Sequence, residues 1–200
     1  MIQIKEIYRG YKFRIYPTPQ QIELIEKTFG CCRWYWNQAL HDYVEYYKEH
    51  DKSKIVTPAT YKQNNEWLKE VDSMALCYTQ MELKSAFTKF FKEPTVGFPK
   101  FKSKHKEYYP SYSTCKRIGI KKGFIKIPKL KWIRCKTHRE INGVPEKITI
   151  SKTPTGKYYA SILVKEVITE YKQSDSVIGI DLGIKEFAVI NNGEFTEHIK

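Results

Sequence analysis

The chain has 200 residues, enough for one medium domain or two small ones with a hydrophobic core. Its 35 Lys and Arg against 22 Asp and Glu give a formal charge of +13, which favours a nucleic-acid partner, the alternative being a basic surface kept for solubility. No apolar run approaches the ~20 residues that span a bilayer, and the start lacks the apolar block of a signal peptide, so we expect a soluble cytoplasmic protein with no membrane partner.

The five cysteines do not predict a disulfide framework. They are odd in number and include no C-x-x-C pair, which also argues against a zinc ribbon, so zinc is not expected in this chain. We expect them to be small buried side chains in a reducing compartment: Cys31, Cys32, Cys77, Cys115 and Cys135.

Residues 8–16 alternate between apolar and polar side chains, which predicts a half-buried strand with a basic outer face. Helices follow. The run Thr18-Pro19-Gln20-Gln21 combines an N-cap, a proline in the first turn and a capping box. We expect that helix to stop at Gly30 and a second helix to cover 32–47. Further helices are predicted after Thr57-Pro58 and from Ser73.

Residues 97–136 carry thirteen Lys or Arg and a single acid, Glu107, with aromatic side chains between them. Such a stretch suits a groove that follows a nucleic-acid backbone and offers stacking platforms, although a solvated basic face is the simpler interpretation. The candidate phosphate contacts, here and in the earlier elements, are Lys12, Arg14, Arg33, Lys100, Lys102, Lys104, Lys116 and Arg117. The candidate stacking residues, which are as a class more often core, are Tyr35, Trp36, Phe98 and Phe101.

Short apolar stretches separated by glycine-containing turns begin within this basic segment and continue beyond it, which predicts several antiparallel strands. Their spacing indicates a small barrel or curled sheet, which the strand at 8–16 would join. The predicted strands cover 112–115, 124–127, 132–136, 147–151 and 158–164.

The sharpest motif is the run Val177-Ile-Gly-Ile-Asp-Leu-Gly-Ile-Lys185. It predicts two buried strands with a carboxylate, Asp181, at a strand end and Gly183 in the first turn. A buried carboxylate is costly unless it binds a cation, and oxygen ligands suit Mg²⁺ or Mn²⁺, two of which nucleases of the ribonuclease H type use. Two alternatives stay open. The motif also resembles the opening of actin-like ATPases, and an aspartate at a strand end can simply cap a turn.

Two stretches together resemble the TnpB (IS605 OrfB) family of transposon-encoded, RNA-guided nucleases. Tyr11-Lys-Phe-Arg-Ile-Tyr-Pro-Thr-Pro-Gln20 and residues 28–37 are similar to the opening of these proteins, and Gly179-Ile-Asp-Leu-Gly-Ile-Lys185 is similar to the first catalytic motif of their RuvC-like domain. The resemblance implies a guide RNA from the transposon end, a target DNA, and Asp181 as a catalytic carboxylate that binds Mg²⁺ or Mn²⁺.

The resemblance also implies an α+β organisation in four parts. These are a wedge-like barrel over 1–17 and 97–168, a helical recognition insertion over 18–96, a linker over 169–176 and the start of a truncated ribonuclease H-like domain over 177–200.

The chain departs from the family pattern downstream of Asp181. The family needs a further Glu, a further Asp and a four-cysteine zinc ribbon, yet only nineteen residues follow Asp181. Glu186, Glu194 and Glu197 are present and are not assigned the missing role. We therefore expect the nucleic-acid-binding amino-terminal part of a nuclease, inactive alone. A stand-alone binding module or transposon regulator, and an enzyme completed by another chain, are the alternatives, and the oligomeric state stays open.

Overall fold

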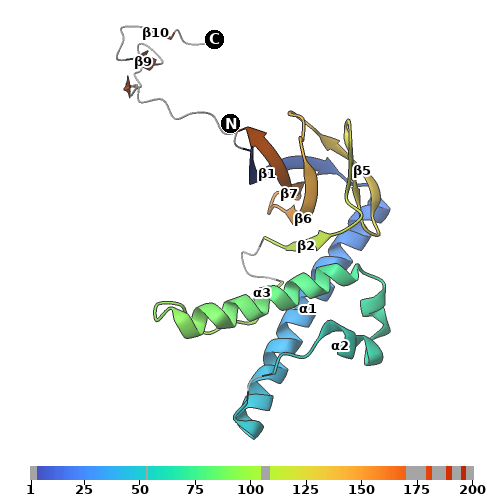
Figure 1. Cartoon of the computed structure of the whole chain (residues 1–200). Coiled ribbons are helices and arrows are strands. Elements are labelled where there is room, and N and C mark those ends of the chain that lie inside the picture. Colours follow the sequence, from blue (N-terminus) through green and yellow to red (C-terminus); the bar gives the residue numbers. More distant parts are fainter. Residues whose placement is uncertain are drawn as a thin grey trace. The chain divides into compact units, whose positions relative to one another are not determined.

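The computed structural model describes residues 4–52, 54–104, 109–169, 179–181, 188–190 and 195–196. The chain divides into two compact units, one over 6–167 and one made of 1–5 with 168–200. In its described part, the first unit combines a curled antiparallel sheet with three helices, so the expected α+β class is confirmed (Figure 1).

The large sheet has seven strands in the order β2-β6-β7-β1-β5-β4-β3. With β2 and β3 at its edges it is an open half-barrel, which agrees with the curled sheet that was one of the two expected forms. The edge strand β2 packs against the third helix (Figure 1). Sequence reasoning missed only the three-residue β3, which is too short to show alternation. The strands are β1 (Ile4–Tyr16), β2 (Ser111–Cys115), β3 (Gly119–Lys121), β4 (Phe124–Ile127), β5 (Lys131–Lys136), β6 (Val144–Lys152) and β7 (Tyr158–Thr169).

The first helix, α1 (Pro19–His50), is continuous, so the expected break at Gly30 is wrong. The capping box is confirmed, because the Thr18 hydroxyl accepts from the Gln21 N–H and the Gln21 side chain accepts from the Thr18 N–H at 2.9 Å. Phe29 and Cys31, on either side of Gly30, are both buried. Tertiary packing of these neighbours outweighs the low helix propensity of one glycine.

Replacing Gly30 with alanine is expected to raise the free energy of unfolding by about 0.5–1 kcal/mol, since alanine is the better helix former. A Cβ at this position would meet no atom within 4 Å. Urea unfolding followed by circular dichroism measures the change. The control is Gly123→Ala, which should lower stability because Gly123 has a φ of +76°. Equal loss in both variants would contradict the prediction.

The remaining helices are α2 (Pro58–Asn64), the 3-10 turn η1 (Glu66–Lys69) and α3 (Ser73–Lys92). As predicted, α2 begins after Thr57, but the Thr57 hydroxyl contacts the Thr60 hydroxyl at 3.1 Å instead of capping the backbone. The helix α3 is capped by Asp72, whose carboxylate accepts from the Met74 N–H at 3.3 Å.

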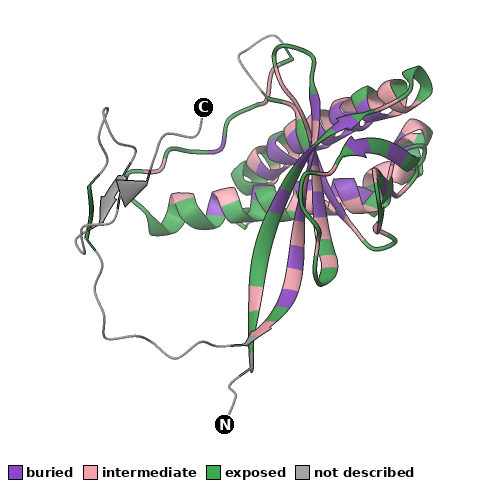
Figure 2. Cartoon of the chain, turned by 90° about the horizontal axis from the view of Figure 1, so that it is seen from above, coloured by how far each residue is buried: buried purple, intermediate pink, exposed green. Residues whose placement is uncertain are grey.

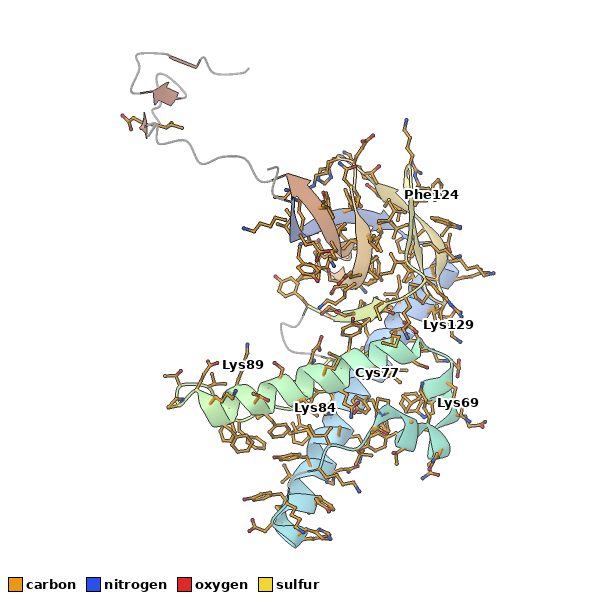
Figure 3. The ribbon with its side chains drawn as sticks, in the orientation of Figure 1. Lys69, Cys77, Lys84, Lys89, Phe124 and Lys129 are labelled. Atoms are coloured by element: carbon orange, nitrogen blue, oxygen red, sulfur yellow. The ribbon has the colours of Figure 1, made fainter. Side chains whose placement is uncertain are left out.

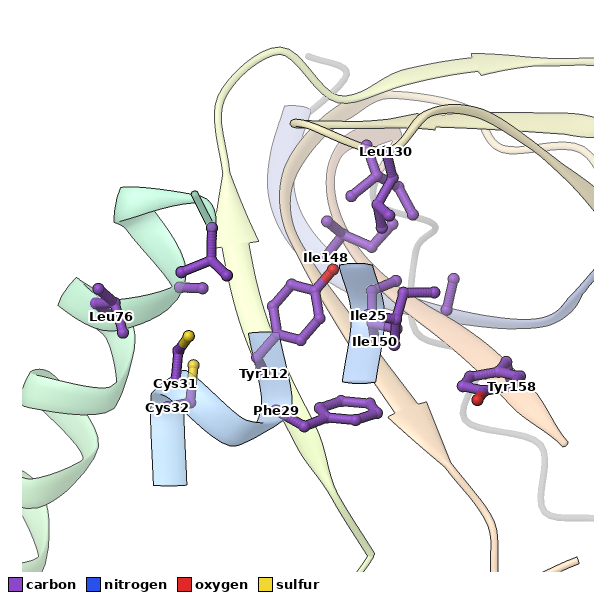
Figure 4. Close-up of a cluster of buried hydrophobic side chains, with 14 of the residues drawn as sticks. Ile25, Phe29, Cys31, Cys32, Leu76, Tyr112, Leu130, Ile148, Ile150 and Tyr158 are labelled. Carbon is purple, nitrogen blue, oxygen red and sulfur yellow. The ribbon is translucent and has the colours of Figure 1, made fainter. Parts of the chain in front are cut away.

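One hydrophobic core joins the inside of the half-barrel to the helices. Phe29 of α1 meets Tyr112 of β2 at 5.7 Å between ring centres, and these two rings lie near Ile148 and Ile150 in Figure 4. Figure 2 shows buried positions alternating with exposed ones along the strands. Two of the candidate stacking residues, Tyr35 and Trp36, lie in this core, whereas Phe98 and Phe101 are exposed.

All five cysteines are free. Cys31, Cys32 and Cys135 are buried, as expected, whereas Cys77 and Cys115 are only half-buried. Burial raises the pKa of Cys31 to about 11 and that of Cys32 to about 12. Because the thiolate is the nucleophile, we expect both to resist N-ethylmaleimide at pH 8 while Cys77 and Cys115 react first. Peptide mapping by mass spectrometry checks this order. Fast labelling of Cys32 in the folded protein would contradict it, with urea-unfolded protein as the fully reactive control.

In the described part of the second unit, β8 (Ile180–Asp181), β9 (Ala188–Ile190) and β10 (Phe195–Thr196) form an antiparallel sheet in the order β10-β9-β8. Asp181 ends β8 as predicted and pairs with Val189. The expected burial is wrong, because Ile180 is 63% exposed and Asp181 is exposed too. The proposed linker beyond 169, Gly183, Glu186, Glu194 and Glu197 lie outside the described residues.

Candidate nucleic-acid interface

Alternation along β1 separates a core face from a basic face. Tyr11, Phe13 and Ile15 are buried, while Lys12 and Arg14 are exposed, as the sequence predicted. The neighbouring strands β5 and β4 alternate in the same way. We call outer face the exposed side chains that alternate with buried ones over 12–16, 124–126 and 132–136: Lys12, Arg14, Tyr16, Phe124, Lys126, Trp132, Arg134 and Lys136.

The strand register interleaves cations with aromatic rings on the outer face. Arg134 of β5 lies opposite Tyr16 of β1 and also opposite Phe124 of β4. Directly opposed side chains on neighbouring strands lie close enough to contact one another. Trp132 lies opposite Lys126 in the same way. The rings of Tyr16, Phe124 and Trp132 are 41%, 40% and 39% exposed, so each keeps a surface open to a ligand.

Cations lie over these rings. The Arg14 guanidinium is 5.1 Å from the centre of the Tyr16 ring, and that of Arg134 is 5.9 Å from it. The Lys121 ammonium, on β3, is 4.4 Å from the Trp132 ring and 5.1 Å from the Phe124 ring. Partly exposed rings held among cations offer stacking surfaces for bases and charges for phosphates, the combination that binds single-stranded nucleic acid.

The first turn of α1 holds this face in place. The Gln21 amide donates to the backbone oxygens of Leu130 and Trp132, at 2.8 and 3.1 Å, while its carbonyl completes the capping box. Gln21, which completes the capping box of α1, therefore also holds the start of β5 and the backbone of Trp132 in place.

The predicted basic loop is bound to α1. The Trp36 indole donates to the Lys100 oxygen at 2.9 Å, and the Asn37 amide exchanges two hydrogen bonds with the Lys102 backbone at 2.8 and 2.9 Å. The side chains of Lys100 and Lys104 are exposed. That of Lys102 lies 4.0 Å from the Trp36 ring centre, and burial lowers its pKa. A phosphate contact by Lys102 stays a prediction, and its side chain is less exposed than those of Lys100 and Lys104.

The other predicted residues are distributed over several elements. Lys12 and Arg14 share the outer face, Arg33 is half-buried on α1, and Lys116 and Arg117 are exposed in the turn after β2. The residues that sequence reasoning did not single out are Tyr16, Phe124, Lys126, Trp132, Arg134 and Lys136. The alternation in Lys131–Lys136 was the available signal, because it places every second residue of a basic run on one side.

A metal centre does not form within the described residues. Asp181 is exposed and by itself supplies one carboxylate, and the described residues include no group of three or more His, Cys, Asp or Glu suited to a metal ion. Of the predicted catalytic residues, the structure therefore places Asp181 only, and its role as a metal ligand stays a prediction. Among the same residues, no helix is both long and apolar enough to cross a membrane.

Comparison with known proteins supports a nucleic-acid role. A family model named HTH_OrfB_IS605 and described as a helix-turn-helix domain matches residues 1–52. The described part of this range, 4–52, contains β1 and a single helix, α1. "Putative RNA-guided DNA endonuclease InsQ" of Escherichia coli (strain K12) is 28% identical over 199 residues, which cover 96% of this chain and 49% of InsQ.

Two further relatives differ in length. "Putative RNA-guided DNA endonuclease" of Streptomyces pristinaespiralis is 26% identical over 204 residues, which cover 96% of this chain and 50% of that protein. "Virulence protein VsdF" of Salmonella dublin is 35% identical over 112 residues, which cover 48% of this chain and 94% of VsdF. The chain thus spans about half the length of the two endonuclease-named relatives. On the family match and these alignments, the chain belongs to the TnpB (IS605 OrfB) family of transposon-encoded proteins.

Proposed function

We propose that this chain is the nucleic-acid-binding amino-terminal portion of a transposon-associated, RNA-guided DNA endonuclease. The observation that carries the proposal is the outer face, where Tyr16, Phe124 and Trp132 alternate with unburied cations across three paired strands. The names of the two longer relatives support the same activity for the complete enzyme.

The outer face would hold the scaffold of a guide RNA by its backbone and by unpaired bases. Arg14, Arg134 and Lys136 would contact phosphates, which fix the position of a strand without selecting its sequence. Stacking on Tyr16 and Trp132 is equally tolerant of sequence, since every base has an aromatic face. Selection of the DNA target therefore falls to base pairing with a guide RNA derived from the transposon end.

Catalysis belongs to the complete enzyme. There we assign Asp181 as one ligand of Mg²⁺ or Mn²⁺ in a RuvC-like domain that begins near residue 177, as the motif resemblance implies. When bound there, such ions would supply the Lewis acidity that hydrolysis of a phosphodiester requires. The remaining carboxylates would have to come from outside the described residues.

The test is to purify the chain from cells that carry the flanking transposon end, and to sequence the bound RNA across a salt series. A discrete RNA from the element's end, lost steeply as salt rises, is the expected result. Arg134→Ala with Lys136→Ala should weaken binding and reduce the slope of log K against log salt by about 1.4. Absence of any bound RNA at low salt would overturn the proposal.

A matched control removes two lysines elsewhere, by Lys48→Ala with Lys52→Ala. Lys48 lies in the last turn of α1 and Lys52 just beyond its end, and both are exposed. The helix has 32 residues and is about 48 Å long, and its other end is bound to β5. This variant loses the same charge but none of the outer face. It should bind the RNA more tightly than the Arg134/Lys136 variant does. Equal weakening in both variants would show that overall charge, and not the outer face, drives binding.

A stand-alone binding module or transposon regulator is the second candidate. It is favoured by VsdF, of which 94% is covered by an alignment that uses 48% of this chain, so one relative consists of little more than this portion. Tight, specific RNA binding with no cleavage of a matched DNA, even when the chain is extended to the length of the longer relatives, would select it.

A further inference from the structure

A second basic feature lies beside the outer face. It is a hollow formed by the turn after β2, the turn that joins β4 to β5 and the residues that begin α3. Figure 3 labels Lys129 in the second of these turns, toward the helices, with Phe124 at the other end of β4. We call it the basic hollow and define it by its five cations: Lys116, Arg117, Lys126, Lys129 and Lys131.

The described residues leave most of the positive charge of the basic hollow uncompensated. The one acid in its lining is Asp72. One oxygen of that carboxylate caps α3 at the Met74 N–H, and the other accepts a short hydrogen bond from the Thr114 hydroxyl. None of the five cations forms an ion pair with a carboxylate in the described part of the chain. Cations that gather without partners are costly unless an anion joins them.

Four of the five cations of the basic hollow also have an unusual backbone conformation. Five described residues other than glycine have a positive φ, and four of them line the basic hollow: Lys116 at 63°, Arg117 at 51°, Lys129 at 65° and Lys131 at 61°. Glycine or asparagine adopts this conformation more readily than lysine or arginine. Across Lys129 the turn is especially tight, because the Leu130 N–H donates to the Pro128 oxygen at 2.8 Å.

Fold stability alone would therefore favour glycine at these four positions. Long cationic side chains stand there instead, all directed at one hollow. Strained backbone of this kind is typical of binding and catalytic sites, where the surrounding structure maintains it.

We propose that the basic hollow binds a phosphate group of the nucleic-acid backbone, next to the bases held on the outer face. Its lining contains no aromatic ring, so it offers charge without a stacking surface. Lys126 connects the two features, because it lines the hollow and lies opposite Trp132 on the outer face. A strand whose base stacks on Trp132 would present a neighbouring phosphate to Lys126, Lys129 and Lys131. The inference rests on the proposed nucleic-acid function and deepens it.

The test exploits the backbone conformation. In the Lys129→Gly, Lys131→Gly variant two cations are lost while the positive φ values become favourable, so the melting temperature should stay equal or rise. Binding of a fluorescein-labelled single-stranded 20-mer RNA, measured by anisotropy at several salt concentrations, should weaken about tenfold, with a salt slope lower by about 1.4. Lys48→Ala with Lys52→Ala, which removes two exposed cations outside the hollow, should bind more tightly than the double variant.

The outcomes separate this inference from the proposed function. Unchanged RNA binding by the double variant, with weakened binding by Arg134→Ala, overturns the basic hollow and leaves the outer face in place. Failure of the unmodified chain to bind RNA overturns both. If the double variant melts at a lower temperature, Lys116→Gly with Arg117→Gly provides the second test on the opposite turn. If a double variant of either turn folds stably and keeps full RNA affinity, the inference is wrong.

Discussion

An Asp181→Ala variant of the complete enzyme is expected to lose cleavage of a matched DNA target and to keep its bound RNA. Asp181 ends β8 opposite Val189, and the proposed role is that of a metal ligand. Loss of several kcal/mol of metal-dependent stabilisation lowers the cleavage rate by about 10³-fold or more. Plasmid nicking with Mg²⁺ measures the rate, and the absorbance ratio of the purified complex measures the RNA.

The control for this variant is Glu49→Ala, which removes an exposed carboxylate from α1 and should cleave at the unmodified rate. Normal cleavage by the Asp181→Ala variant would contradict the assignment of Asp181 as a catalytic residue. Loss of both cleavage and RNA would instead assign Asp181 a structural role.

The second large effect concerns the stability of the half-barrel. Phe13→Ala is expected to lower the free energy of unfolding by about 3–5 kcal/mol, because a buried phenylalanine leaves a cavity when it is truncated. Phe13 is 1% exposed, and its ring lies 5.1 Å from that of His138 and 6.3 Å from that of Tyr11. Urea unfolding followed by tryptophan fluorescence measures the loss.

Arg14→Ala, one residue further along β1, is the matched control. Its side chain is exposed on the opposite face, so stability should change by no more than about 0.5 kcal/mol while RNA affinity falls. The two variants thus separate folding from binding within one strand. If Arg14→Ala destabilises as much as Phe13→Ala, the two-faced description of β1 is wrong.

Several features follow from the sequence because they depend on neighbouring residues. Alternation fixes which side of β1 faces the core, so the opposite faces of Phe13 and Arg14 follow from the order of residues alone. The capping box at Thr18 is local in the same sense, and it occurs where it was expected. The family resemblance was also available, because its motifs are contiguous runs of residues.

Predictions from short sequence patterns were wrong or incomplete where tertiary packing determines the structure. Gly30 weakens a helix by itself, yet its buried neighbours hold α1 continuous. Trp36 could serve a base or the core, and only the fold shows it buried and donating to the Lys100 oxygen. Asp181 was expected in a buried strand and is exposed, because burial depends on layers that a short motif does not specify.

The sequence by itself determined the basic character of residues 97–136, the faces of the strands and the family. The tertiary structure alone decided which cations and rings meet. Arg134 reaches Tyr16 because β5 pairs with β1, and the basic hollow exists because two distant turns close on the start of α3. Pairing between segments far apart in the chain is set by the whole core, so no local pattern of residues records it.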